Sequence, residues 1–240
     1  MEVDIFIPCY IDQIFPQTGI NMVKVLEKAG CKVNYNPNQT CCGQPAFNAG
    51  FWDECKEVGE KFIKEFAGNK RYIVTPSASC SAMVKNYYEK MFHNSVLHNE
   101  YKEVKSNIIE FSDFLVNILK VTDFGSTFEG VVTYHDSCAA LREYGLKNEP
   151  RILLEKVKGL TLKEMKETDT CCGFGGLFAV KFEPISASMA DQKMGHATDT
   201  GAEFMVSTDT SCLLHLGSFA DRQKLPIKTL HLADVLASGW

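Results

Sequence analysis

The chain carries the tripeptide Cys-Cys-Gly twice, in "TCCGQPAFNAG" and again in "TCCGFGGLFAV". Two more cysteines accompany each copy at nearly the same spacing. Each cysteine of the second half follows its counterpart by 129 to 132 residues; the first set is Cys9, Cys41, Cys42 and Cys80, and the second is Cys138, Cys171, Cys172 and Cys212. Similarity at one fixed period indicates that a structural unit has been duplicated.

The residues around these cysteines repeat as well. The matched segments are "VLEKAG" (25–30) with "LLEKVKG" (153–159), "TPSASC" (75–80) with "STDTSC" (207–212), and "EFSDFL" (110–115) with "HLADVL" (231–236). The last pair keeps an aspartate, Asp113 or Asp234, which we expect near a helix N-terminus. A turn-rich stretch at 124–130 separates the halves. We therefore predict two repeats, residues 1–124 and 125–240.

Hydrophobic periodicity predicts strands that alternate with helices in each half. Expected strands lie at 2–8, 31–36, 71–76, 131–135, 159–163 and 203–207, and expected helices at 16–30, 53–66, 80–92, 150–158, 183–199 and 212–219. Such alternation is typical of parallel sheets. The predicted fold class is α/β, with two pseudo-symmetric repeats that each form a small parallel sheet flanked by helices.

Each set of four cysteines follows the ends of expected strands, and the carboxyl ends of parallel strands lie at one edge of a sheet. The loops at that edge should bring the four thiolates together. Gly43 and Gly173 would let the backbone turn tightly beside a bulky group. Four thiolates bind Zn²⁺ or an iron–sulfur cluster. Adjacent cysteines are a poor zinc knuckle, so the pattern favours a cluster; zinc and thiol redox chemistry stay open as alternatives.

Composition narrows the remaining choices. The 240-residue chain holds ten cysteines, a number better explained by metal or redox chemistry than by disulfides in a reducing compartment. The net charge of −5 and the lack of a basic cluster argue against nucleic acid. The N-terminus lacks the features of a signal peptide, and no run is long enough for a transmembrane segment. We expect a cytoplasmic protein. Cys31 and Cys55 have no counterparts and are expected to be inert.

Two polar residues precede Cys138 in "YHDSC". His135 and Asp136 are candidate catalytic residues, able to place a base or a proton donor beside the second site. The alternative is a structural role at the end of a strand. The first half has Phe6 and Ile7 at the equivalent positions, so the polar pair belongs to the second half alone.

Three further side chains are weaker candidates. His215 lies one helical turn after Cys212 and could be a ligand, although a place on a helix face is the simpler interpretation. Its counterpart Met83 is expected in the core. Arg142 could pair with a carboxylate. No phosphate-binding motif is present, so nucleotide binding is not expected.

Together these motifs resemble the cysteine-rich CCG domain of heterodisulfide reductase B subunits and glycolate oxidase iron–sulfur subunits. The segments "IPCYIDQIFPQTGI", "QTCCGQPAFNAG", "TCCGFGGLFAVK" and "VSTDTSCLLHLG" are similar to the lactate-utilisation protein A family along nearly the whole chain. One departure is clear. Heterodisulfide reductase B subunits end each motif with CxxC, whereas this chain has Met83 and His215 at the final position.

The resemblance implies an iron–sulfur, electron-transfer subunit of an L-lactate-oxidising complex. The eight paired cysteines would hold [4Fe–4S] clusters, one per repeat. The implied partners are two other proteins of that system, one of them also iron–sulfur, and the 2-hydroxy acid would be handled only indirectly. Two other functions stay open: a zinc-stabilised scaffold subunit, and a thiol–disulfide oxidoreductase like the heterodisulfide reductases.

Overall fold

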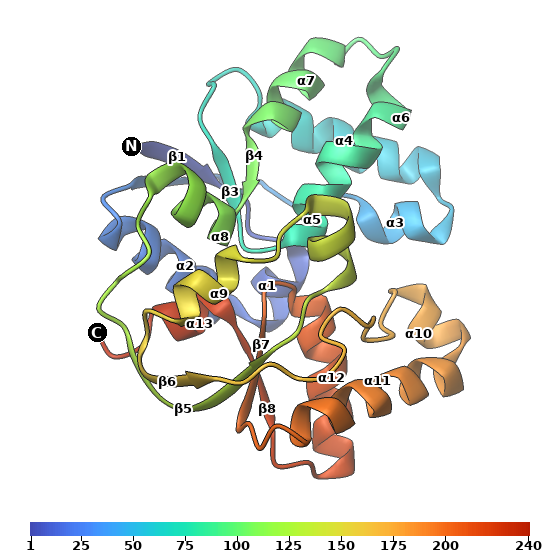
Figure 1. Ribbon diagram of the computed structural model, residues 1–240. Coiled ribbons are helices and arrows are strands. Elements are labelled where there is room, and N and C mark those ends of the chain that lie inside the picture. Colours follow the sequence, from blue (N-terminus) through green and yellow to red (C-terminus); the bar gives the residue numbers. More distant parts are fainter.

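The two halves of the chain form two lobes, each built on a four-stranded parallel sheet (Figure 1). This computed structural model describes residues 1–240. The first lobe contains β1 (Glu2–Ile5), α1 (Cys9–Ile14), α2 (Pro16–Lys28), β2 (Lys32–Tyr35), α3 (Gln44–Ala49), α4 (Trp52–Phe66), β3 (Ile73–Thr75), α5 (Ala78–Ala82), the π-helical η1 (Met83–Tyr87), α6 (Tyr88–Phe92), α7 (His98–Asn107), β4 (Ile108–Glu110), α8 (Phe111–Asp113) and the π-helical η2 (Phe114–Leu119).

The second lobe repeats this order with fewer helices. It contains β5 (Thr127–Tyr134), the π-helical η3 (Ala139–Tyr144), α9 (Glu149–Leu154), β6 (Lys158–Leu162), α10 (Leu177–Lys181), α11 (Glu183–Thr198), β7 (Phe204–Ser207), α12 (Thr210–Gln223), β8 (Lys228–His231) and α13 (Leu232–Leu236). No helix of the chain is both long enough and apolar enough to span a bilayer.

The two sheets have the same strand order and register. The orders are β2-β1-β3-β4 and β6-β5-β7-β8. Asp4 pairs with Ile73 across β1 and β3, and Thr133 pairs with Met205 across β5 and β7, so the equivalent residues face each other in both sheets. The predicted α/β class with two pseudo-symmetric parallel repeats is confirmed.

The structure contains elements that the prediction lacks, and it breaks one predicted helix. Each sheet has a fourth strand, β4 or β8, which runs directly into the next helix with no turn signal after it. Several short helices, such as α3 and α7, are also additional. The helix expected at 80–92 is also not continuous, because η1 interrupts it with a π-helical turn.

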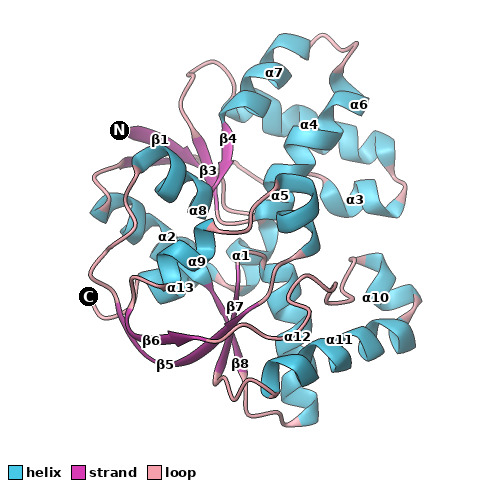
Figure 2. Ribbon diagram, in the orientation of Figure 1, coloured by secondary structure: helices cyan, strands magenta, loops and turns pink.

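Alternation along the strands separates a central core from an outer core in each lobe. Val3 and Ile5 point into a central core shared by the two lobes, whereas Phe6 belongs to the outer core under α4, α6 and α7. In the second lobe Val206 is central, and Met205 lies in the outer core under α11 and α12. Figure 2 shows α2, α9 and α13 between the two sheets.

Each lobe places its C-terminal helix against the other lobe. Helix α13 packs on α2, and α8 packs on α9. The two recurring aspartates make these contacts polar as well as apolar: Asp234 accepts hydrogen bonds from Thr18 Oγ1 and Asn21 Nδ2, each at 2.9 Å, and Asp113 accepts one from Tyr144 Oη at 2.6 Å. Since each lobe completes the core of the other, the relative position of the two cysteine sets is fixed.

Candidate functional site

The cysteines lie at the carboxyl edge of each sheet. Cys9 begins α1 after β1, and Cys80 lies in α5 after β3. The second lobe matches this arrangement, with Cys138 just before η3 and Cys212 in α12 after β7. The Cys-Cys-Gly segments are the loops that lead from β2 to α3 and from β6 to α10.

In the first lobe the four thiols form two close pairs. The Sγ atoms of Cys9 and Cys41 are 3.8 Å apart, and those of Cys42 and Cys80 are 3.4 Å apart. The Gly43 amide also donates to Cys41 Sγ at 3.4 Å. Thus the adjacent cysteines point to different partners, which explains why they do not need to pair with each other.

The second lobe holds its adjacent cysteines in the same way. The Gly173 amide donates to Cys171 Sγ at 3.4 Å, and the Phe174 amide donates to Cys172 Sγ at 3.5 Å. In both lobes the glycine after the pair has a positive φ, +85° for Gly43 and +92° for Gly173. The left-handed turn at this glycine aims backbone amides at the sulfurs.

All eight cysteines line a single cavity of about 210 Å³ between the lobes. Tyr10 of the first lobe and Phe174 of the second also line it, and their rings contact edge to face with centroids 5.9 Å apart. The sequence predicts two cysteine sites but says nothing of their relative position. The structure brings both sites to the same space.

One thiol in each site has a lowered pKa. Contacts with the thiols of Cys42 and Cys9 lower the pKa of Cys41 to about 3, and contacts with Cys138 and Cys172 lower the pKa of Cys171 to about 2. The partner thiols show the opposite effect, since the pKa of Cys9 is raised by its hydrogen bond with Cys41 and by burial. Each site therefore already favours a thiolate, the form that binds metals.

The donor set fits either a metal ion or an iron–sulfur cluster. The ligand atoms of His135, Cys172 and Cys212 all lie within 4.8 Å of one another. Four thiolates on one zinc ion would be about 3.8 Å apart, given a Zn–S bond of about 2.3 Å. The close thiol pairs of the first lobe, at 3.8 and 3.4 Å, have this spacing, and four thiolates can equally hold a [4Fe–4S] cluster.

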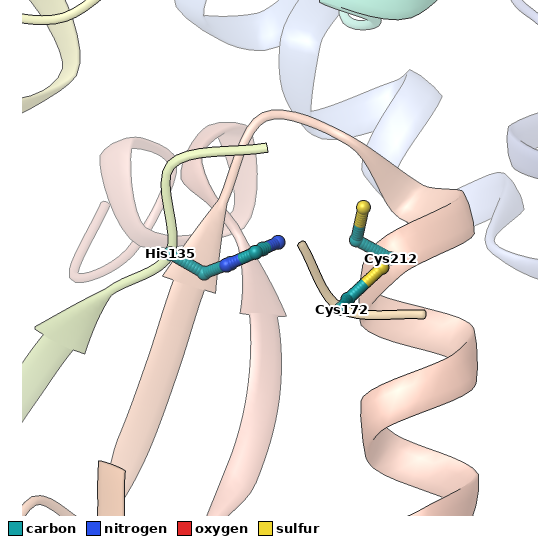
Figure 3. Close-up of side chains that lie close together, drawn as sticks. All are labelled: His135, Cys172 and Cys212. Atoms are coloured by element: carbon teal, nitrogen blue, oxygen red, sulfur yellow. The ribbon is translucent and has the colours of Figure 1, made fainter. Parts of the chain in front are cut away.

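His135 and Asp136 have different environments. His135 is fully buried at the end of β5, and burial, with the nearby Lys193 cation, lowers its pKa to about 3. Asp136 accepts a two-pronged salt bridge from Arg151, at 2.9 and 2.8 Å. A carboxylate held in this way anchors the strand end, whereas His135 is directed toward the cysteines (Figure 3).

The other candidates lie outside the thiol cluster. Met83 is fully buried in the outer core of the first lobe, as expected. His215 is half-buried, with Nε2 3.2 Å from Ser186 Oγ. Arg142 is exposed at the surface, and its guanidinium donates to the Asp169 carbonyl at 2.9 Å.

One residue of the cavity was not singled out from the sequence. Asp209 is 1% exposed and accepts hydrogen bonds from Ser77 Oγ and the Ser79 amide, each at 3.1 Å, and from Ser137 Oγ. It therefore ties the two lobes together beside the cysteines. The sequence does distinguish this residue: the matched motifs "TPSASC" and "STDTSC" have Ser77 in the first half and Asp209 in the second.

Two parallel α/β repeats whose strand-end cysteines meet in one cavity define a duplicated cysteine-rich-domain protein. The family model described as "Cysteine-rich domain" (CCG) matches residues 3–85 and 132–217, one match per lobe. The chain belongs to the lactate utilization protein A family. It is 43% identical to lactate utilization protein A of Halalkalibacterium halodurans over 98% of this chain and 96% of that protein.

One further relative supports the assignment, and one solved structure shares the fold. Lactate utilization protein A of Geobacillus kaustophilus is 42% identical, over 98% of each chain. A crystal structure of a hypothetical protein from Helicobacter pylori has a similar fold, with a TM-score of 0.64 and 12% identity. The present chain is covered completely in that comparison but spans only 49% of the Helicobacter protein.

Proposed function

We propose that this protein is a cytoplasmic iron–sulfur subunit of an L-lactate-oxidising system and carries electrons between the lactate-oxidising centre and an acceptor. Its relatives are named for lactate utilization. The observation that carries the proposal is the convergence of eight cysteines, four from each lobe, on one cavity. The cytoplasm suits it because thiols stay reduced there.

In this proposal the four cysteines of each lobe hold one cluster. A [4Fe–4S] cluster supplies one-electron transfer when bound. The chain itself supplies the thiolates, the amides of Gly43 and Gly173 that donate to sulfur, and buried apolar side chains packed behind the sites. Because both sites face one cavity, two one-electron centres would serve the two-electron oxidation of a 2-hydroxy acid.

The partners follow from the same proposal. The chain lacks a nucleotide-binding motif for a flavin or nicotinamide. We infer that the 2-hydroxy acid is oxidised with other subunits of the system, one of them also an iron–sulfur protein. Cluster reduction on addition of lactate should therefore require those subunits. Reduction by lactate of this chain alone would contradict the inference.

Anaerobic purification tests the cofactor. We expect a brown protein with about four iron and four sulfide per occupied site, and a visible band that dithionite bleaches. Zinc without iron after strictly anaerobic reconstitution would instead identify the scaffold subunit. Disulfide reduction that is abolished by Cys171→Ser would identify the thiol–disulfide oxidoreductase.

A further inference from the structure

The two cysteine sites differ at several buried positions, and His135 occupies the one at the end of the first strand. His135 lies three residues before Cys138, and Phe6 lies three residues before Cys9. Both side chains are fully buried at the carboxyl end of the first strand of their lobe. Tyr134 points into the central core, so strand alternation turns His135 to the outer side of the sheet, where Cys172 and Cys212 lie.

In the first lobe this position is apolar and fully packed. The ring of Phe6 contacts the rings of Phe62 and Phe66 with centroids 4.8 and 5.9 Å away. The Phe6 ring therefore brings no atom that could bind a metal to the first site. At the first site we therefore expect thiolates to be the metal ligands.

In the second lobe the equivalent residue is polar and lacks a partner. Neither Nδ1 nor Nε2 of His135 makes a hydrogen bond, although the side chain is fully buried. Buried polar atoms nearly always have a hydrogen-bond partner, and burying one without a partner destabilises the fold. Figure 3 shows the ring directed at Cys172 and Cys212. A ring nitrogen and these two sulfurs all lie within 4.8 Å of one another.

The surrounding residues offer the imidazole no other partner. Cys55 lies beside Gly43 in the first lobe, and Ser186 lies beside Gly173 in the second. Seven residues after each of these, the first lobe has Phe62 and the second has Lys193. Lys193 is fully buried, but its Nζ donates to the carbonyls of Glu167 and Thr168 at 2.6 and 3.2 Å. These two bonds direct Lys193 to backbone carbonyls, and neither nitrogen of His135 has a hydrogen-bond partner.

We propose that His135 is a metal ligand of the second site, which would then bind its metal through nitrogen as well as thiolate donors, whereas the first site uses thiolates alone. This rests on the proposed function in that both sites hold metal. The other histidine nearby, His215, is already hydrogen-bonded to Ser186. Imidazole in place of thiolate raises the reduction potential of an iron–sulfur centre. The second site should therefore be the more easily reduced of the two.

Pulsed EPR on protein with isotopically labelled histidine tests the ligand directly. The first site is emptied by Cys9→Ser with Cys42→Ser, and iron analysis establishes that the second remains filled. A nitrogen strongly coupled to the reduced cluster is expected, and His215→Phe should leave that coupling unchanged. His135→Cys should retain the iron, lose the coupling and lower the midpoint potential. His135→Phe, which copies the first lobe, should keep the fold and the iron on its four thiolates but lose the nitrogen coupling.

Absence of the coupling from the filled parent site, or its persistence in His135→Cys, would overturn the proposal. Metal analysis separates this failure from failure of the proposed function. If the protein takes up zinc and no iron, electron transfer is excluded, and zinc-edge X-ray absorption then decides the ligand. A nitrogen neighbour that disappears in His135→Cys would support His135 as a ligand, and an all-sulfur shell would refute it. A second site that binds neither metal refutes both proposals.

Discussion

Ser77 and Asp209 stand at equivalent positions of the two repeats, and Ser77 Oγ donates a hydrogen bond to Asp209 Oδ1 over 3.1 Å. Each residue lies three positions before the last cysteine of its repeat. The approximate symmetry axis of the molecule therefore passes near this contact, beside the shared cavity. Both residues line the cavity that the two cysteine sets share.

Loss of the Asp209 carboxylate should loosen the two lobes. Asp209→Ala leaves three buried or half-buried donors without their acceptor. We expect the free energy of unfolding to fall by about 3 kcal/mol, because hydrogen bonds to charged groups contribute about 1.5–3 kcal/mol each and are not additive. Urea denaturation measures the change. Asp221→Ala, at the exposed end of α12, is the control and should have little effect. An alanine variant as stable as the parent would refute the bridging role.

Each Cys-Cys-Gly segment should contribute to one metal site independently. Cys42→Ser and Cys172→Ser should each lower the iron content by about one site, and the double variant should hold almost no iron, because each buried thiol is central to its own set. Iron and sulfide analysis after anaerobic reconstitution measures the loss. Cys31→Ala, in the central core away from the cavity, should keep its full iron. Unchanged iron in both single variants would contradict the ligand assignment.

Gly173 should tolerate no side chain. Its φ is +92°, and a Cβ there would lie 2.8 Å from the Ser186 carbonyl oxygen and 2.9 Å from Met189 Cβ. We expect Gly173→Ala to cost about 2 kcal/mol of stability and to weaken metal retention, since the strain displaces the loop that carries Cys172. The matched control is Gly195→Ala in α11, where a Cβ meets open space and should stabilise the helix by about 1 kcal/mol. Equal effects in thermal unfolding would disprove the steric argument.

Glu110 should make stability depend on pH. The carboxyl is fully buried, and desolvation raises its pKa from 4.5 to about 8. The folded state therefore binds a proton that the unfolded state has released between these values, so stability falls as pH rises from 4.5 to 8. The loss from pH 5 to pH 8 is on the order of 3 kcal/mol. Glu110→Gln should remove it in urea titrations at the two pH values, whereas Glu100→Gln, at an exposed position of α7, should not.

Much of the fold could be predicted from local patterns. The duplicated cysteine spacing predicts two repeats, and the alternation of strands and helices predicts parallel sheets, because hydrophobic periodicity is a property of neighbouring residues. The placement of cysteines at strand ends predicts that Cys9 meets Cys41, and their Sγ atoms are 3.8 Å apart. The strand β4 was not predicted, because it lies directly between α7 and α8 and no turn residues mark its ends.

The cysteine spacing alone identifies the two four-cysteine sets, and the aligned repeats show His135 and Asp136 where the first half has Phe6 and Ile7. That both sets share a cavity depends on contacts between distant residues, because α13 packs against α2 and Asp209 bonds to Ser77 across more than half the chain. The two residues of the polar pair also have different surroundings in the folded chain. Arg151 neutralises Asp136, and burial without a hydrogen-bond partner leaves His135 facing the thiols, because burial and pairing depend on residues distant in sequence.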